Sequence, residues 1–171
     1  LRLTDEDQPQ ALVTCRLWSL ASGQCLVPGR NPDAEGKLIL SGLTPDTYEL
    51  RLSGFGYWPA ALEVEAVKGG RHYEVEARRV GDLSLRFTST GGATLANQEV
   101  AMEFLPTGET LQGWVAAGKL GGFDGGVRTD SSGKLDLIGL PHGTYRWSCA
   151  GGSGEVAVEV GKLVNVSLLV P

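Results

Sequence analysis

Cysteine and histidine are scarce in this sequence, and long apolar runs are missing altogether. Three cysteines are too few for a disulfide framework, and two histidines leave little material for a metal site. No apolar run approaches the ~20 residues of a membrane span, so we predict none in this chain. Acidic residues outnumber basic ones by 20 to 15 and no basic stripe exists, which argues against nucleic acid as a partner.

An initiator methionine and a signal peptide are also missing, and Leu1 already resembles the start of a strand. We therefore expect a fragment of a longer polypeptide that is flanked by other domains.

Glycine, by contrast, is abundant at 25 residues, and one phrase occurs twice. Residues 33–48 read DAEGKLILSGLTPDTY, and residues 130–145, each 97 positions later, read DSSGKLDLIGLPHGTY. This repeat predicts two copies of one small β module, residues 1–80 and 81–171. The boundary near Val80 and Gly81 has almost no linker, which predicts a stiff tandem pair.

Apolar and polar residues alternate with a period of two through most of both halves. Such alternation is typical of antiparallel sheets whose inner faces pack together. The segments that show it are residues 47–53, 62–66, 73–78, 83–87, 100–104, 145–149, 156–160 and 164–170. The fold class that we predict is all-β, with two tandem antiparallel β-sandwiches.

Glycine-containing turns separate these strands. Asp33 with Gly36, and Asp130 with Gly133, take the first and last positions that a type I turn prefers. Residues 68–71 and 160–162 are predicted to be hairpin turns between the last two strands of each half. Only the second half carries an insertion, residues 107–128, which is rich in glycine and is predicted to be a long mobile loop.

The repeated phrase resembles the carboxypeptidase regulatory-like, or prealbumin-like, domain. In the first half the residues that carry the resemblance are Asp33, Gly36, Leu38, Leu40, Gly42, Leu43, Pro45, Thr47, Tyr48, Gly56 and Tyr57. In the second half they are Asp130, Gly133, Leu135, Leu137, Gly139, Leu140, Pro141, Gly143, Thr144 and Tyr145. The resemblance implies a seven-stranded Ig-like or transthyretin-like sandwich, used as an accessory domain in secreted and cell-envelope proteins.

Structural roles explain the residues of this motif. Tyr48 and Tyr145 follow a turn and begin a core strand, so we expect buried rings whose hydroxyls bond turn backbone, as in a tyrosine corner. Gly42 and Gly139 are expected to supply backbone freedom where a strand leaves the sheet.

The sequence offers little support for a catalytic function. Related sandwiches form a Lys–Asn crosslink with a catalytic Glu, but the matching positions here are Leu52 and Cys149. The two histidines, His72 and His142, lie in different halves, and no nucleophile–base pair can be assembled. We therefore predict that the chain is not an enzyme and that it uses no cofactor or metal.

Three groups of residues remain as candidates. Cys15 and Cys25 flank a turn and are either a disulfide or two reduced thiols. Residues 55–59 form an aromatic cluster that either binds a ligand through Tyr57 and Trp58 or caps the sandwich with Phe55 and Tyr57, with Trp58 expected to be exposed. Trp114, in the glycine-rich insertion, is the other candidate contact.

The function that we predict is a non-catalytic spacer and loop-presenting scaffold of a larger extracytoplasmic protein, with a protein or polysaccharide partner. The alternative is a carbohydrate-binding module, which requires the rings of Tyr57, Trp58 or Trp114 to form a flat exposed platform. A long exposed edge strand would also allow pairing with another chain.

Overall fold

Strands account for most of the described chain, as the alternating pattern predicts. The computed structural model describes residues 2–4, 13–54, 56–121, 123 and 126–171. The chain divides into two units, Leu1–Arg79 and Val80–Pro171. Their boundary lies one residue before the boundary predicted from the repeat.

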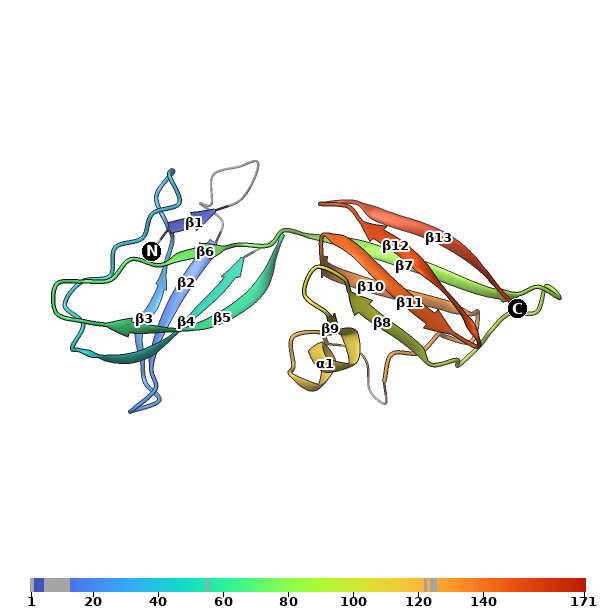
Figure 1. The fold of residues 1–171 in the computed structure, drawn as a ribbon, viewed down its shortest axis with the longest axis horizontal. Helices are drawn as coiled ribbons and strands as arrows, with labels where there is room; N and C mark the ends of the chain where they lie inside the picture. Colours follow the sequence, from blue (N-terminus) through green and yellow to red (C-terminus); the bar gives the residue numbers. More distant parts are fainter. Residues whose placement is uncertain (1, 5–12, 55, 122, 124–125) are drawn as a thin grey trace. The chain divides into compact units, whose positions relative to one another are not determined.

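The first unit contains a four-stranded antiparallel sheet in the order β3-β2-β4-β5 (Figure 1). A parallel pair, β1-β6, forms a second and much smaller sheet. Alternate residues of β2 and β4 are fully buried and make the floor of the core, as the period of two predicts. The strands are β1 (Arg2–Thr4), β2 (Val13–Ser19), β3 (Cys25–Arg30), β4 (Asp46–Gly54), β5 (Tyr57–Ala66) and β6 (Glu74–Glu76).

The second unit is a sandwich of a three-stranded sheet, β10-β7-β13, and a four-stranded sheet, β12-β11-β8-β9. The inward-facing residues of β7, β8 and β11 form its core, among them Phe87, Phe104 and Tyr145. All its strand pairs are antiparallel except β7 with β13. The elements are β7 (Val80–Ser89), β8 (Val100–Phe104), β9 (Glu109–Thr110), α1 (Leu111–Ala116), β10 (Lys134–Pro141), β11 (Gly143–Cys149), β12 (Gly152–Val158) and β13 (Leu163–Val170).

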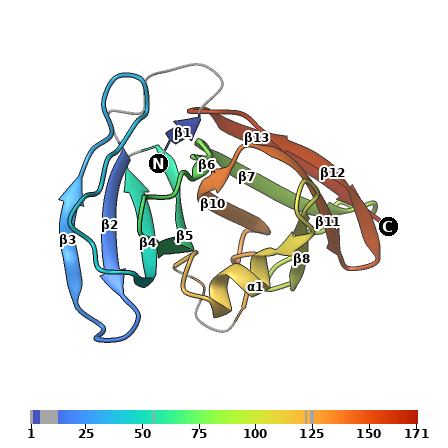
Figure 2. The same cartoon turned by 60° about the vertical axis from the view of Figure 1, so that its left-hand side comes forward.

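A short helix replaces part of the predicted mobile loop. In α1 the Thr110 side chain caps the N-terminus by accepting a hydrogen bond from the Gly113 backbone N–H at 3.1 Å. Leu111 and Trp114, three residues apart on the same face of the helix, are buried, and α1 lies beside β8 (Figure 2). The prediction of a loop was therefore wrong for residues 109–116.

The predicted hairpin turns at residues 68–71 and 160–162 are also wrong. The strands on either side of each segment belong to different sheets: β6 pairs with β1 instead of β5, and β13 pairs with β7 instead of β12. Both segments carry the chain across from one sheet to the other. Alternation fixes which face of a strand is apolar, but it does not fix the strand's neighbour.

The two units differ in a segment whose sequences are identical at five of eight positions. Residues 134–141 form β10, which pairs with β7 across a register shift between Leu137 and Leu140. The corresponding residues, 37–44, form no strand. Leu38 is nevertheless buried and Leu40 packs against the core, so the segment covers the first sheet although it is not itself a strand.

Candidate functional site

The aromatic residues proposed as ligand contacts are buried. Tyr57 and Trp58, at the start of β5, are only 9% and 8% exposed. The backbone N–H of Trp58 donates to the Arg78 backbone carbonyl at 2.8 Å. The prediction that Trp58 is exposed was wrong. Phe55, the third aromatic of that cluster, lies outside the described residues.

Trp114 is buried as well, at 2% exposure. Its ring lies 5.8 Å from that of Phe104 and 6.3 Å from that of Tyr145, the latter in an edge-on arrangement. It anchors the insertion to the core and cannot stack on a sugar. Tyr57, Trp58 and Trp114 therefore form no platform, and the carbohydrate-binding alternative loses its premise.

The two motif tyrosines occupy equivalent corners. Tyr48 Oη donates to the Thr44 carbonyl at 2.8 Å, and Tyr145 Oη donates to the Pro141 carbonyl at 2.7 Å. Both rings are buried. The sequence predicted both the buried rings and the bonds from the hydroxyls to turn backbone. In each case the bonded carbonyl belongs to the residue four positions before the tyrosine.

The two motif aspartates cap their own turns. Asp33 Oδ1 accepts from the Lys37 N–H at 2.7 Å, and Asp130 Oδ1 accepts from the Lys134 N–H at 2.9 Å. The Lys134 backbone bond and the Ser132 hydroxyl favour the charged carboxylate, so the pKa of Asp130 lies below its ordinary value. The carboxylates thus serve the backbone of the turn, with glycine at φ 73° and 72° closing each one.

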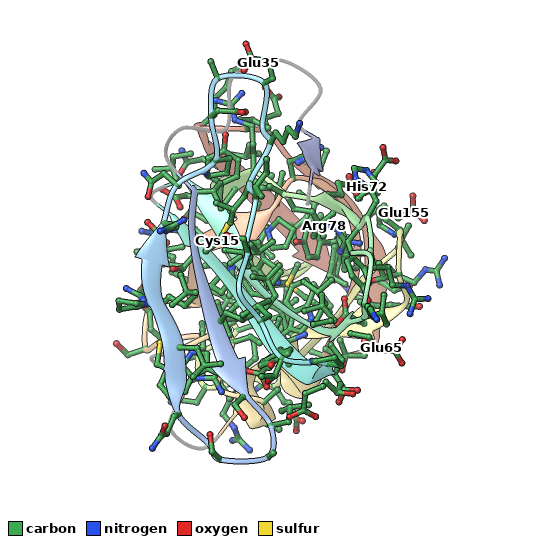
Figure 3. All side chains as sticks on the ribbon, turned by 90° about the vertical axis from the view of Figure 1, so that its left-hand side faces the viewer. Cys15, Glu35, Glu65, His72, Arg78 and Glu155 are labelled. Atoms are coloured by element: carbon green, nitrogen blue, oxygen red, sulfur yellow. The ribbon has the colours of Figure 1, made fainter. Side chains whose placement is uncertain are left out.

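Cys15 and Cys25 are free thiols, so the disulfide alternative is not realised. The register sets Cys25 opposite Trp18 and Cys15 opposite Arg30, which separates the two sulfurs along the hairpin. Figure 3 shows Cys15 among the interior side chains of the first unit. Burial raises its pKa to about 11, which leaves the thiol protonated and inert near neutral pH.

A cleft of about 440 Å³ opens in the first unit where residues 37–44 fail to form a strand. Its floor is the inner face of the four-stranded sheet, with Leu17, Leu50 and Val64. Residues 37–43 form one wall, and residues 65–67 and 70–73 form the other. No sequence signal pointed to this cleft, because the repeat does not predict that residues 37–44 form no strand.

Polar contacts hold the second wall in place. The Glu65 N–H donates to Tyr73 Oη at 2.7 Å, and that hydroxyl donates to the Glu65 carbonyl at 3.2 Å. Arg71 forms an ion pair with the Glu65 carboxylate and lies over the Tyr73 ring, 5.5 Å from its centroid. The labelled Glu65 and His72 lie at the periphery in Figure 3. The cleft therefore combines an apolar floor with a fixed rim that includes Lys37 and Arg71.

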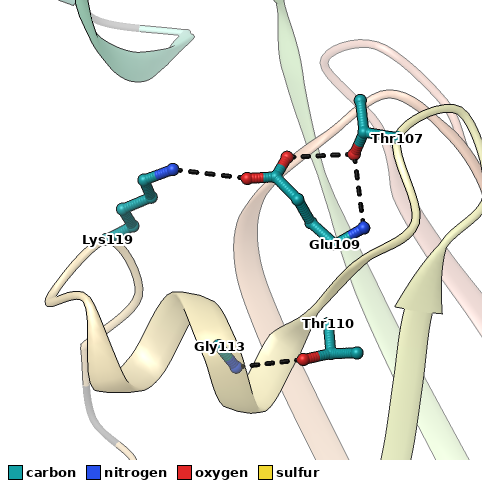
Figure 4. A network of polar contacts seen from close by, with 5 residues as sticks. All are labelled: Thr107, Glu109, Thr110, Gly113 and Lys119. Carbon is teal, nitrogen blue, oxygen red and sulfur yellow. Dashed lines mark hydrogen bonds and ion pairs between the residues drawn. The ribbon is translucent and has the colours of Figure 1, made fainter.

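A second polar cluster surrounds Glu109 in the other unit (Figure 4). Its carboxylate accepts from Thr107 Oγ1 at 2.9 Å and lies 3.4 Å from Lys119 Nζ. Partial burial opposes ionisation, but the hydrogen bond from Thr107, the nearby Trp114 indole and the Lys119 charge outweigh it and lower the pKa of Glu109. The cluster ties α1 to β9.

Acid should weaken this cluster. Because the folded-state pKa of Glu109 is lowered, its contribution to stability is present above the ordinary pKa of 4.5 and is lost as pH falls through the lowered value. We expect Glu109→Gln to destabilise the second unit at neutral pH, with a difference from wild type that shrinks below pH 4.5. Urea unfolding midpoints between pH 7 and pH 2.5 measure this. The exposed Glu99→Gln is the control, and an equal pH trend in both variants contradicts the prediction.

The described geometry defines a small all-β sandwich protein whose candidate site is a cleft in its first unit. Among the described residues, no group of three or more His, Cys, Asp or Glu side chains gathers to hold a metal ion. No described helix is long and apolar enough to cross a membrane.

No protein-family model matches the chain, and no curated protein matches it. Solved structures similar to it include the Bacillus anthracis TIE protein, at 15% identity and TM-score 0.41 over 99% of this chain and 32% of that one. The minor pilin GBS52 of Streptococcus agalactiae gives 19% identity and TM-score 0.40 over 97% and 86%. The shaft pilin SpaA of Lactobacillus rhamnosus GG gives 13% identity and TM-score 0.36 over 96% and 90%. Likenesses at this level carry no inference about function.

Proposed function

We propose that this chain is a non-catalytic spacer and interaction region, built from two related β-sandwich modules, within a larger extracytoplasmic protein. One observation carries the proposal: at an offset of 97 residues, the same residue types make the same structural bonds in both units. Tyrosine and aspartate are residues that catalysis can use, and here the motif copies serve turns and corners. The extracytoplasmic setting follows from the resemblance to prealbumin-like accessory domains.

If Tyr48 and Tyr145 stabilise two separate modules, removing the hydroxyl of either tyrosine should lower the stability of its own unit. Tyr145→Phe leaves the buried Pro141 carbonyl without its partner, at a cost of about 1–3 kcal/mol. Tyr48→Phe should cost less, about 0.5–1.5 kcal/mol, because Thr44 is exposed and water replaces the lost bond. Chemical denaturation of the tandem, followed by NMR peaks from each unit, measures both. A loss that spreads equally over both units contradicts the two-module proposal.

The spacer role requires that the two units move together, as the near-absence of a linker predicts. Backbone ¹⁵N relaxation of the whole chain should give one rotational correlation time for both units. Insertion of six Gly-Ser residues between Arg79 and Val80 is the matched control and should separate the two values. Two different correlation times in the unmodified chain would rule out a stiff spacer.

The cleft favours a second role, the binding of an extended protein segment. Its apolar floor suits an apolar side chain. Arg71 is paired with Glu65, so Lys37 on the rim is the cation that suits an acidic neighbour. Tyr73, an aromatic ring of the lining, is covered by Arg71, which disfavours sugar stacking. The proposed ligand is therefore an apolar and acidic peptide segment.

Anilinonaphthalene sulfonate, an apolar dye with an anionic group, provides a probe of this cleft. We expect its fluorescence enhancement to fall in Ile39→Glu and Val67→Glu, which change exposed residues of the lining. Ile138→Glu changes an equally exposed isoleucine in the second unit and should leave the signal unchanged. An equal fall in all three variants would show that the dye does not report on the cleft.

A further inference from the structure

Strand β13 is an edge strand with unusual composition. In the sheet β10-β7-β13 it pairs, among the strands that the structure describes, with β7 alone. Its eight residues, LVNVSLLV, include no charge, no proline and no glycine. Leu163 and Leu169 are 60% and 68% exposed. Such an edge presents unpaired backbone N–H and C=O groups to any strand of matching pattern.

The other described edge strands all carry a feature that discourages pairing. Strands β1 and β9 have only three and two residues, and β10 is bulged between Leu137 and Leu140. Proline, glycine or charge interrupts the rest. Examples are Pro28 in β3, Pro59 in β5, Glu74 in β6 and Gly152 in β12. Of the edge strands that the structure describes, β13 therefore lacks the features that discourage pairing.

The outward residues of β13 show what fits this edge. They are Leu163, Asn165, Ser167 and Leu169, an order of apolar, polar, polar and apolar that is the same in both directions. When a second β13 runs antiparallel about a two-fold axis at Val166, Leu163 lies opposite Leu169 of the second copy, and Asn165 lies opposite Ser167.

Other registers lose this match. A shift by one residue sets outward side chains against inward ones. A shift by two sets leucine against serine or asparagine. In the two-fold register, the inward residues Val164, Val166 and Leu168 also meet only apolar partners. No like charges oppose one another, because the strand has none.

We propose that β13 is a homotypic interaction surface, through which two copies of this chain join their three-stranded sheets into one continuous six-stranded sheet. The pairing satisfies the open backbone edge and covers four exposed leucines, two from each copy. This surface is separate from the cleft of the first unit and does not depend on its ligand.

Sedimentation equilibrium of the whole chain between 1 µM and 1 mM tests the proposal. We expect a monomer–dimer equilibrium whose dissociation constant rises at least tenfold in Leu169→Lys. Ile138→Lys, an equally exposed change on the opposite edge strand of the same sheet, should leave it unchanged. Monomer at every concentration, or an equal effect of both substitutions, overturns the proposal.

Crosslinking tests the register. In a Cys25→Ser background, mixed Asn165→Cys and Ser167→Cys chains should oxidise mainly to the heterodimer. The opposed Cβ atoms would lie about 5 Å apart, against about 7–8 Å for each homodimer. Homodimers formed as readily as the heterodimer would show association through another surface or register.

Discussion

Replacement of Trp114 by alanine should lower the free energy of unfolding of the second unit by about 3–5 kcal/mol. The ring is 2% exposed and packs on Phe104 and Tyr145, so its loss leaves a cavity beside these two rings. It also removes the indole that supports the Glu109 carboxylate. Urea unfolding followed by circular dichroism measures the change without reliance on tryptophan fluorescence.

The control for this loss is Ile138→Ala, in the same unit at 75% exposure, which should change stability by less than about 0.5 kcal/mol. A cost below about 1 kcal/mol for Trp114→Ala would mean that α1 is not part of the cooperative unit. The experiment therefore separates a packed insertion from the mobile loop that the sequence predicted.

A second large loss of stability is expected when Gly133, in the turn that Asp130 caps, is replaced by alanine. Its φ of 72° is left-handed, and an added Cβ would lie 2.8 Å from the Phe87 carbonyl oxygen and 2.7 Å from Thr94 Cγ2. Strain and collision together predict a loss of about 2–5 kcal/mol for Gly133→Ala. Denaturant unfolding of the second unit measures it.

Gly139 offers a matched comparison because its φ of 71° is nearly the same, but nothing lies within 4 Å of an added Cβ. Gly139→Ala should therefore cost only the backbone term, about 1–2 kcal/mol. If the two variants lose the same stability, the close approach of Phe87 to the turn does not matter energetically.

The local features of the fold were predictable because they depend on residues close together in the sequence. A tyrosine four residues after a turn, or an aspartate three residues before a glycine, makes bonds within its own segment. Alternation likewise identified the buried faces of β4, β7, β8 and β11. Helix α1 was missed because its signals, Thr110 as cap and Leu111 with Trp114 on one face, cover fewer than two turns among many glycines.

Long-range features were not predictable from pattern alone. Residues 37–44 and 134–141 are identical at five of eight positions, yet only the second segment forms a strand. That strand pairs with β7, and the local sequence does not specify such a partner. The cleft of the first unit follows from that difference, so no local motif marks it. Trp58 shows the same limit: it is buried beside a register shift between β4 and β5, and a period of two does not reveal such a shift.

The parallel pairing of β7 with β13 determines how the second unit responds to tension. The unit begins with β7 and ends with β13, so a pull on its two ends slides these strands along each other. Eight residue pairs, from Leu163 with Asp82 to Val170 with Ser89, then bear the load at once and do not open one by one. The β1–β6 pair of the first unit has only three described pairs in the same arrangement. Under force, the first unit should yield before the second.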